Sequence, residues 1–162
     1  MICCYNEKIC VETYCATFFF SCARYPHEAG MRFTESESGF WDNVAALPGT
    51  QLAADPIVAR TLGWMAQTTK SQRVLEIGTF RGSTTLTLAK CLPPNGTVVT
   101  CDNSGKYVLQ ELWSNSDVGA KIELRQGPIM ETLEQLVQEN APPQFDMVVI
   151  DDDKRRYRSD PV

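Results

Sequence analysis

Acidic residues, glycines and a lysine follow several apolar segments of this sequence, and these residue types can bind a cofactor or move a proton. The first such group is VLEIGTFRG, residues 74–82, in which Glu76 precedes Gly78 and Gly82. Glycine lets the backbone turn tightly and lets a ligand approach it closely. The pattern therefore indicates a ligand-binding loop, although a tight strand-to-helix turn without a ligand would use the same glycines.

The next acidic group, Asp102, ends the apolar segment TVVTCD. An acid at this position can accept hydrogen bonds from the ribose hydroxyls of a nucleoside cofactor, either adenosylmethionine or a dinucleotide. A dinucleotide's pyrophosphate favours a loop with three glycines, and the third glycine is absent here. Glu76 would repel a pyrophosphate but attract the ammonium or sulfonium group of adenosylmethionine. The sequence thus favours adenosylmethionine, and disfavours a nucleotide-dependent dehydrogenase.

A third group, Asp151-Asp152-Asp153-Lys154, follows the apolar segment FDMVVI directly. Clustered carboxylates suit a hard cation such as Mg²⁺, which prefers oxygen ligands. The same residues could instead form a solvated charged turn, because Arg155, Arg156 and Arg158 follow and could pair with the acids. The spacing alone leaves both interpretations open.

Alternating strand and helix patterns are expected to position these groups. Strands are predicted at 74–77, 97–101, 121–125 and 145–150, and helices at 84–92, 107–113 and 130–139. Strands separated by single helices run parallel with right-handed crossovers, so the predicted fold is α/β, a doubly wound parallel sheet. Ligands of such sheets bind at the carboxyl ends of the strands, where all three groups would lie.

A further helix is predicted to begin after Asp55, which can cap it, with Pro56 in its first turn. Ile57, Val58, Leu62 and Met65 fall on one face of this helix, and we expect that face to pack on the sheet. Residues 1–50 show no sustained period and are predicted to be an irregular extension, which leaves 51–162 as the domain.

Composition narrows the class of ligand. The 162 residues are 43% hydrophobic, enough for the core of one domain, and carry a formal charge of −5. This charge argues against nucleic acid or an anionic membrane as a partner and favours a small molecule. Residues 17–20 are too short an apolar run for a signal segment or membrane span, so a cytoplasmic location is expected. Five of seven cysteines lie within residues 1–22 without C-x-x-C spacing, which favours free thiols over zinc or disulfides.

Three blocks carry a family resemblance: VLEIGTFRGSTTLTLAKCLPPNGTVVTCD, then KIELRQGP with METLEQL, then FDMVVIDDDKRRY. In this order and spacing they resemble the cation-dependent O-methyltransferases, a family that includes caffeoyl-CoA and catechol O-methyltransferases. The resemblance spans residues 55–157 and implies a Rossmann-like domain of the class I methyltransferase type. It implies methyl transfer from S-adenosyl-L-methionine to a hydroxyl of a small catechol-like or hydroxycinnamoyl acceptor.

The resemblance also implies roles for individual residues. Glu76 would lie near the methionine amino group of the cofactor, Asp102 on its ribose, and Gly127 and Pro128 beside its adenine. The full set of implied cofactor-binding residues is Glu76, Gly78, Thr79, Phe80, Gly82, Thr84, Asp102, Gly127, Pro128 and Asp151. Asp151 would also be the first magnesium ligand. Lys154 would be the catalytic base, because a chelating Mg²⁺ acidifies the acceptor hydroxyl and a nearby base can then remove its proton.

The family pattern continues beyond the fourth strand, through further strands and an adjacent Asp-Asn pair that completes the metal site, whereas this sequence ends at Val162. We therefore expect a partial domain that lacks its last strands and exposes apolar surface along 145–150. An alternative function follows from this expectation: an inactive chain that acts only as a binding or dimerising module, with a homodimer formed through the sheet edge.

Overall fold

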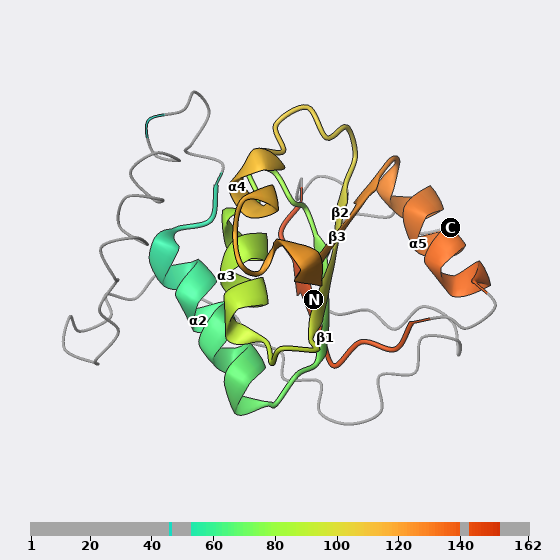
Figure 1. Cartoon of the computed structure of the whole chain (residues 1–162). Coiled ribbons are helices and arrows are strands. Elements are labelled where there is room, and N and C mark those ends of the chain that lie inside the picture. Colours follow the sequence, from blue (N-terminus) through green and yellow to red (C-terminus); the bar gives the residue numbers. More distant parts are fainter. Residues whose placement is uncertain (1–45, 47–52, 140–142, 153–162) are drawn as a thin grey trace.

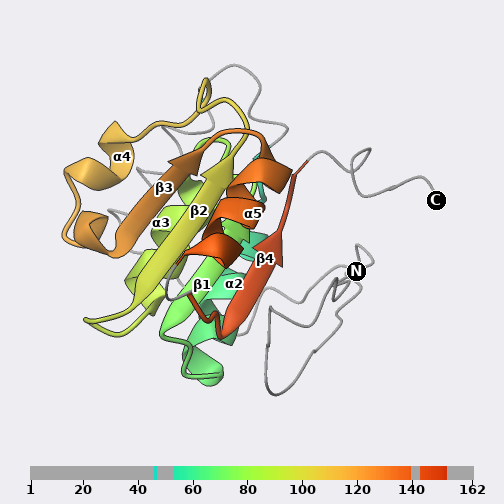
Figure 2. The ribbon, with the colours of Figure 1, turned by 90° about the vertical axis from the view of Figure 1, so that its right-hand side faces the viewer.

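The sheet predicted from the sequence is present in the computed structural model, which describes residue 46 and residues 53–139 and 143–152 (Figure 1). Within these residues, four parallel strands form one sheet in the order β3-β2-β1-β4 (Figure 2). The strands are β1 (Arg73–Ile77), β2 (Thr97–Asp102), β3 (Ile122–Gln126) and β4 (Met147–Ile150). The predicted doubly wound α/β fold is therefore confirmed.

Helices cover both faces of the sheet. Helices α2 (Pro56–Thr68), α3 (Ser83–Cys91) and α4 (Glu111–Ser114) lie on one face, and α5 (Ile129–Gln138) lies on the other (Figures 1 and 2). The chain adds β2 and β3 on one side of β1 and then crosses through α5 to place β4 on the other side. The order of strands thus reverses between β1 and β4, and such a reversal opens a crevice for ligands at the carboxyl ends of the strands.

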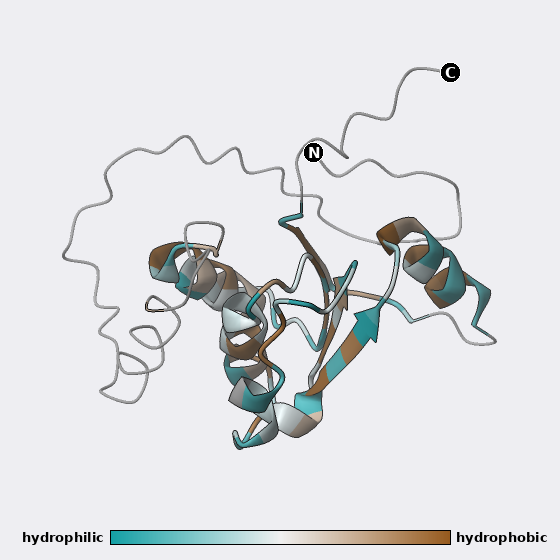
Figure 3. Ribbon diagram, turned by 90° about the horizontal axis from the view of Figure 1, so that it is seen from above, coloured by the Kyte–Doolittle hydropathy of each residue, from teal (hydrophilic) through white to brown (hydrophobic). Residues whose placement is uncertain are grey.

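The two central strands are apolar and β-branched because both of their faces are buried. Val74 pairs with Val98, and both belong to the core on the α3 face. Their neighbours Leu75 and Val99 belong to the core on the α5 face. Because side chains alternate along a strand, the polar residues Glu76 and Thr100 point toward the α3 face. The edge strand β3, in contrast, alternates apolar and polar residues (Figure 3).

Helix α2 begins as predicted but buries a different face. The Asp55 carboxylate accepts a hydrogen bond from the amide of Ile57 at 2.7 Å, which is the expected cap. Ile57 is 56% exposed, however, and the buried residues are Ala59, Gly63 and Ala66. A Cβ atom on Gly63 would lie 2.6 Å from Cys91 Sγ of α3. Of the predicted apolar face, Leu62 packs against the core, whereas the prediction was wrong for Ile57 and Val58. A face of small residues lets α2 approach α3 closely.

The helix predicted at 107–113 was also wrong in extent, since only Glu111–Ser114 is helical. The Asp102 carboxylate accepts hydrogen bonds from the amides of Ser104 and Gly105 and so holds the chain in a turn after β2. Such side-chain bonds compete with a helix for backbone groups. In α5, Leu136 is buried and Leu133 packs against the core, whereas Met130 is 69% exposed.

Strand β4 lies at one edge of the sheet, and no strand among the described residues pairs with its outer side. The exposure predicted along 145–150 is uneven: Ile150 is 40% exposed, whereas Phe145 is 8% exposed and has the guanidinium of Arg73 5.7 Å from its ring centroid. No helix in the described part of the chain is long and apolar enough to cross a membrane. The division into an extension and a domain stays a prediction, because residues 1–45 and 47–52 lie outside the described residues.

Candidate cofactor-binding site

The loops that follow β1, β2, β3 and β4 meet at the carboxyl edge of the sheet. Gly78 donates its amide to the carbonyl of Cys101 at 2.9 Å, and Asp151 donates to the carbonyl of Ile77 at 2.9 Å. Gly127 donates to the carbonyl of Asp102 at 3.0 Å. These backbone bonds bring the predicted site residues of all four loops to one edge, at the point where the strand order reverses.

The glycine loop between β1 and α3 is tightly enclosed by its neighbours. Gly78 has φ +99°, and a Cβ atom there would lie 2.3 Å from the carbonyl oxygen of Asp151. Gly82 has φ +84°, and a Cβ atom there would lie 2.1 Å from Cζ3 of Trp113. Both positions require glycine for their backbone conformation and for space. The role of Trp113, which is 3% exposed, was not predicted from the sequence.

Glu76 is the most buried carboxyl group of the site, with 1% exposure. Its Oε2 atom accepts hydrogen bonds from the hydroxyls of Thr85 and Thr100, the latter at 2.7 Å. The hydroxyls of Thr100 and Thr79 lie 2.6 Å apart. Because a hydroxyl has one proton to donate, Thr100 uses its proton on the ionised Glu76 and accepts one from Thr79. Thr79 and Thr100 thus form a hydrogen-bonded chain that ends on the carboxylate, and Thr85 donates to the same oxygen separately.

Burial dominates the ionisation of Glu76. It raises the pKa of this carboxyl from 4.5 to about 7, against the opposing effect of the hydrogen bonds from Thr85 and Thr100. The negative charges of Asp151 and Asp102 raise the pKa further. A carboxylate in this setting is stabilised by a cation that binds close to it.

Asp102 is held by backbone amides of two loops. Its Oδ2 atom accepts from the amide of Phe80 at 3.0 Å, and its Oδ1 atom accepts from Ser104 at 3.1 Å and Gly105 at 3.0 Å. A carboxylate offers about four lone-pair positions, so about one remains for a ligand. Two ribose hydroxyls would have to share that position or displace the Ser104 amide, whose bond is the longest of the three.

The other predicted cofactor contacts lie around Asp102 and the start of α3. Thr84 is buried in the first turn of that helix, whose N-cap residue Gly82 has no side chain to cap it. The first amides of a helix lack intrahelical partners and carry partial positive charge. On the α5 side, the amide of Ile129 donates to Oδ1 of Asn103 at 3.2 Å and fixes the loop that contains Gly127 and Pro128.

The predicted metal site is not assembled by the residues that the structure describes. No group of three histidine, cysteine, aspartate or glutamate side chains among residues 53–139 and 143–152 could hold a metal ion. Asp151 is exposed at the end of β4. The predicted base, Lys154, lies outside the described residues, as does Asp153.

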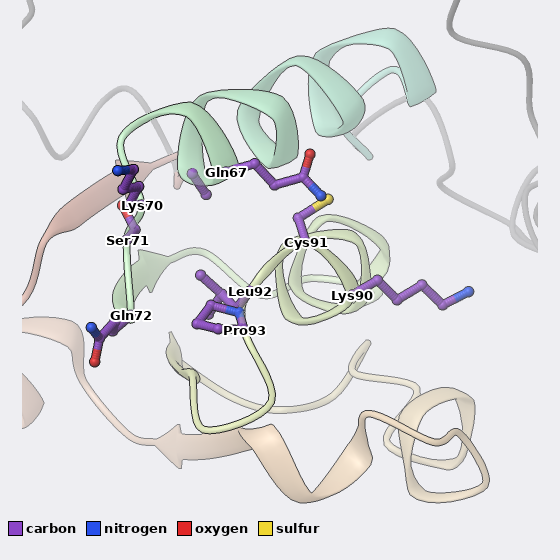
Figure 4. Close-up of a pocket in the computed structure, with 9 residues that line it drawn as sticks. Gln67, Lys70, Ser71, Gln72, Lys90, Cys91, Leu92 and Pro93 are labelled. Atoms are coloured by element: carbon purple, nitrogen blue, oxygen red, sulfur yellow. The ribbon is translucent and has the colours of Figure 1, made fainter.

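A pocket of about 480 Å³ lies away from all of these residues, where α2 and α3 end (Figure 4). Its lining includes Gln67, Lys70, Cys91 and Pro93. Lys90 also lines this pocket, but its side chain points away from the other lining residues (Figure 4). The pocket lies near the beginning of β1, so no residue predicted to bind a cofactor contributes to it.

A doubly wound sheet with a buried glutamate in β1, a glycine loop and a backbone-anchored aspartate after β2 is typical of domains that bind a nucleoside cofactor. The sequence pattern of the O-methyltransferase family matches residues 42–159. The chain therefore belongs to the O-methyltransferase family.

Individual relatives agree with this assignment. A catechol O-methyltransferase of Niastella koreensis is 33% identical over 108 residues, which are 65% of this chain and 48% of that protein. The mouse catechol O-methyltransferase domain-containing protein 1 is 37% identical over 98 residues, 59% of this chain and 37% of that protein. The chain spans about half or less of the length of these two relatives.

Solved structures share the fold. An O-methyltransferase from Bacillus cereus in complex with SAH superposes with a TM-score of 0.68 at 27% identity, over 80% of this chain and 59% of that one. TomG, an O-methyltransferase of Streptomyces achromogenes in complex with SAM, gives a TM-score of 0.65 at 28% identity, over 78% and 57% of the two chains.

Proposed function

We propose that this chain binds S-adenosylmethionine at the carboxyl edge of its sheet and supplies the cofactor-binding part of an O-methyltransferase. The observation that carries the proposal is the buried carboxylate of Glu76 in β1, where the strand order reverses, whose pKa is raised to about 7. An ammonium group would stabilise the charged form of Glu76 and be stabilised by it.

The residues present fit the cofactor on two counts. Glu76 provides the negative charge for an amino group, and Asp102 retains about one acceptor position for a ribose hydroxyl. The relatives whose structures contain SAM or SAH support the same assignment. When bound, the cofactor supplies an electrophilic methyl group. This chain's residues bind and orient it so that the methyl group can align with the acceptor oxygen.

The acceptor is proposed to be a hydroxyl of a small catechol-like or hydroxycinnamoyl molecule, in keeping with the relatives named as catechol and caffeoyl-CoA O-methyltransferases. A cytoplasmic location and the absence of nucleic-acid or membrane partners are part of this proposal. A divalent cation does not fit the described residues alone, because they gather no set of three ligands. Asp151 as a metal ligand and Lys154 as the base stay predictions.

Isothermal titration calorimetry with S-adenosylhomocysteine tests cofactor binding directly. At pH 8 we expect the full chain to bind this ligand, and both Asp102→Ala and Glu76→Gln to weaken binding by about tenfold or more, because each removes a charged hydrogen-bonding group. Asp146→Asn is the matched control, because it also removes one carboxylate but at the opposite end of β1 from the site. There Asp146 accepts hydrogen bonds from the amides of Gln72 and Arg73, so its replacement should not weaken binding of the ligand. A folded wild-type chain that produces no binding heat would contradict the proposal.

A second candidate function is that of an inactive chain that acts as a binding or dimerising module. The position of β4 at the sheet edge, with Ile150 40% exposed, favours this candidate. Methyl transfer to catechol with added Mg²⁺ separates the two functions. Turnover that is lost in Lys154→Ala would exclude the inactive module, whereas a dimer without turnover would support it.

A further inference from the structure

Arg81 occupies an unusual place in the glycine loop, because this long cationic side chain is only 8% exposed. Arginine is rarely buried to this extent unless other groups compensate its charge. Its guanidinium carbon lies 5.1 Å from the ring centroid of Phe80 and 5.5 Å from that of Tyr107. Both distances are typical of cation–π contacts.

Two ring contacts of Arg81 join two loops of the cofactor site. Phe80 and Arg81 belong to the loop after β1, whereas Tyr107 belongs to the turn after β2. The Phe80 and Tyr107 rings also contact each other, with centroids 5.7 Å apart and an interplanar angle of 47°. The same two loops are joined a second time through Asp102, whose Oδ2 atom accepts from the Phe80 amide. Phe80 therefore takes part in both connections.

The backbone of Phe80 needs such support. Its φ angle is +48°, a conformation that side chains with a Cβ atom rarely adopt. Residues in this region persist when their surroundings hold them there. The ring of Phe80 is held between the loops by Arg81 and Tyr107, and its amide is thereby directed at Asp102.

We propose that Arg81 is a positioning residue for the cofactor: it holds Phe80 in place through the two aromatic rings, and Phe80 in turn orients the Asp102 carboxylate toward the ribose. This inference rests on the proposed function. Without the guanidinium group, Phe80 relaxes toward an ordinary backbone conformation and its amide leaves Asp102. Asp102 then loses one of the three amides that fix its orientation.

Binding of S-adenosylhomocysteine to the full chain tests the inference. Arg81→Met keeps the length of the side chain and removes its charge, and we expect it to weaken binding by about 3- to 30-fold, the range of one or two cation–π contacts. Arg81→Lys retains a cation and should recover part of the loss. Tyr107→Ala should weaken binding like Arg81→Met, whereas Tyr107→Phe keeps the ring and should bind like the wild type.

Lys106 provides a matched control. Its Nζ atom lies 5.2 Å from the same Tyr107 ring, but this exposed residue belongs to the same turn as Tyr107 and does not join the two loops. Lys106→Met should change the affinity by less than about twofold. Amide hydrogen exchange adds a local readout: in Arg81→Met, the Phe80 amide should exchange faster, while the Val99 amide in the core strand β2 should keep its rate.

The outcomes distinguish the two proposals. If the wild type binds S-adenosylhomocysteine and Arg81→Met binds it equally well, the inference about Arg81 is overturned and the proposed function stands. If the wild type does not bind, the proposed function fails, and the cofactor role of Arg81 fails with it. An unchanged exchange rate of the Phe80 amide in Arg81→Met would also overturn the inference, whatever the affinity.

Discussion

Replacing Glu76 by glutamine should remove a pH dependence of stability that the wild type possesses. The folded chain raises the pKa of Glu76 from 4.5 to about 7, chiefly through burial. Between these two values the folded state holds a proton that the unfolded state has released, so the free energy of unfolding decreases as the pH rises. The stabilisation is complete below pH 4.5 and is lost once the pH has passed about 7.

The size of the effect follows from the shift. One pKa unit corresponds to about 1.4 kcal/mol, so the wild type should lose about 3 kcal/mol of stability between pH 4.5 and pH 7 through this group. Glutamine keeps the shape of the side chain and an oxygen acceptor for Thr85 and Thr100. The variant should therefore lack this slope and should exceed the wild type in stability above pH 7.

Urea unfolding at half-unit intervals from pH 4.5 to pH 8 measures the difference between the two chains. Glu134→Gln makes the same replacement on an exposed position of α5 and controls for the loss of one charge. A difference between wild type and Glu76→Gln that stays constant over this range would refute the claim that burial governs the ionisation of Glu76.

Three further predictions concern the same elements. Binding of S-adenosylhomocysteine at pH 6 should release up to about one proton, because the ammonium group of the ligand favours the ionised form of Glu76. Calorimetry in buffers of different ionisation enthalpy measures the number of protons released, and a value of zero would contradict the prediction. Gly82→Ala should lower the free energy of unfolding by about 2 to 4 kcal/mol, since φ is +84° and the new Cβ atom meets Trp113; an unchanged melting temperature would argue against this backbone conformation. Asp55→Ala should cost about 1 kcal/mol through the lost cap of α2, whereas Asp55→Asn should largely retain it, as thermal unfolding will show.

The central strands could be predicted because their burial leaves a direct mark on the sequence. Residues 74–77 and 97–101 form nearly continuous apolar runs, and a strand buried on both faces requires them. The start of β4 was harder to predict, because the strand begins at Met147 although the apolar run in the sequence begins at Phe145. Asp146, between the two, binds the amides of Gln72 and Arg73 with its carboxylate, and such a long-range contact depends on the fold.

The sequence predicted which residues lie at the site, but it did not predict the contacts that these residues make. Glu76 and Asp102 end up at one edge because parallel strands place their carboxyl ends together. The partners of Glu76 come from positions 9 and 24 residues further along the chain, and no local pattern relates them. One signal was available: Thr100 is a polar residue within a buried strand, and such a residue needs a hydrogen-bonding partner. No such pattern in the sequence indicated that the side chain of Arg81 is buried.

The cost of burying Glu76 is itself an argument about function. Folded domains are stable by about 5 to 15 kcal/mol, so a carboxylate that removes about 3 kcal/mol at neutral pH is a large fraction of the total. A glutamine would accept the hydrogen bonds of Thr85 and Thr100 without that loss. A group that destabilises the free chain is retained most readily where it binds something. The negative charges of Asp102 and Asp151 add to the cost, and a cation that binds between these three carboxylates would offset their repulsion.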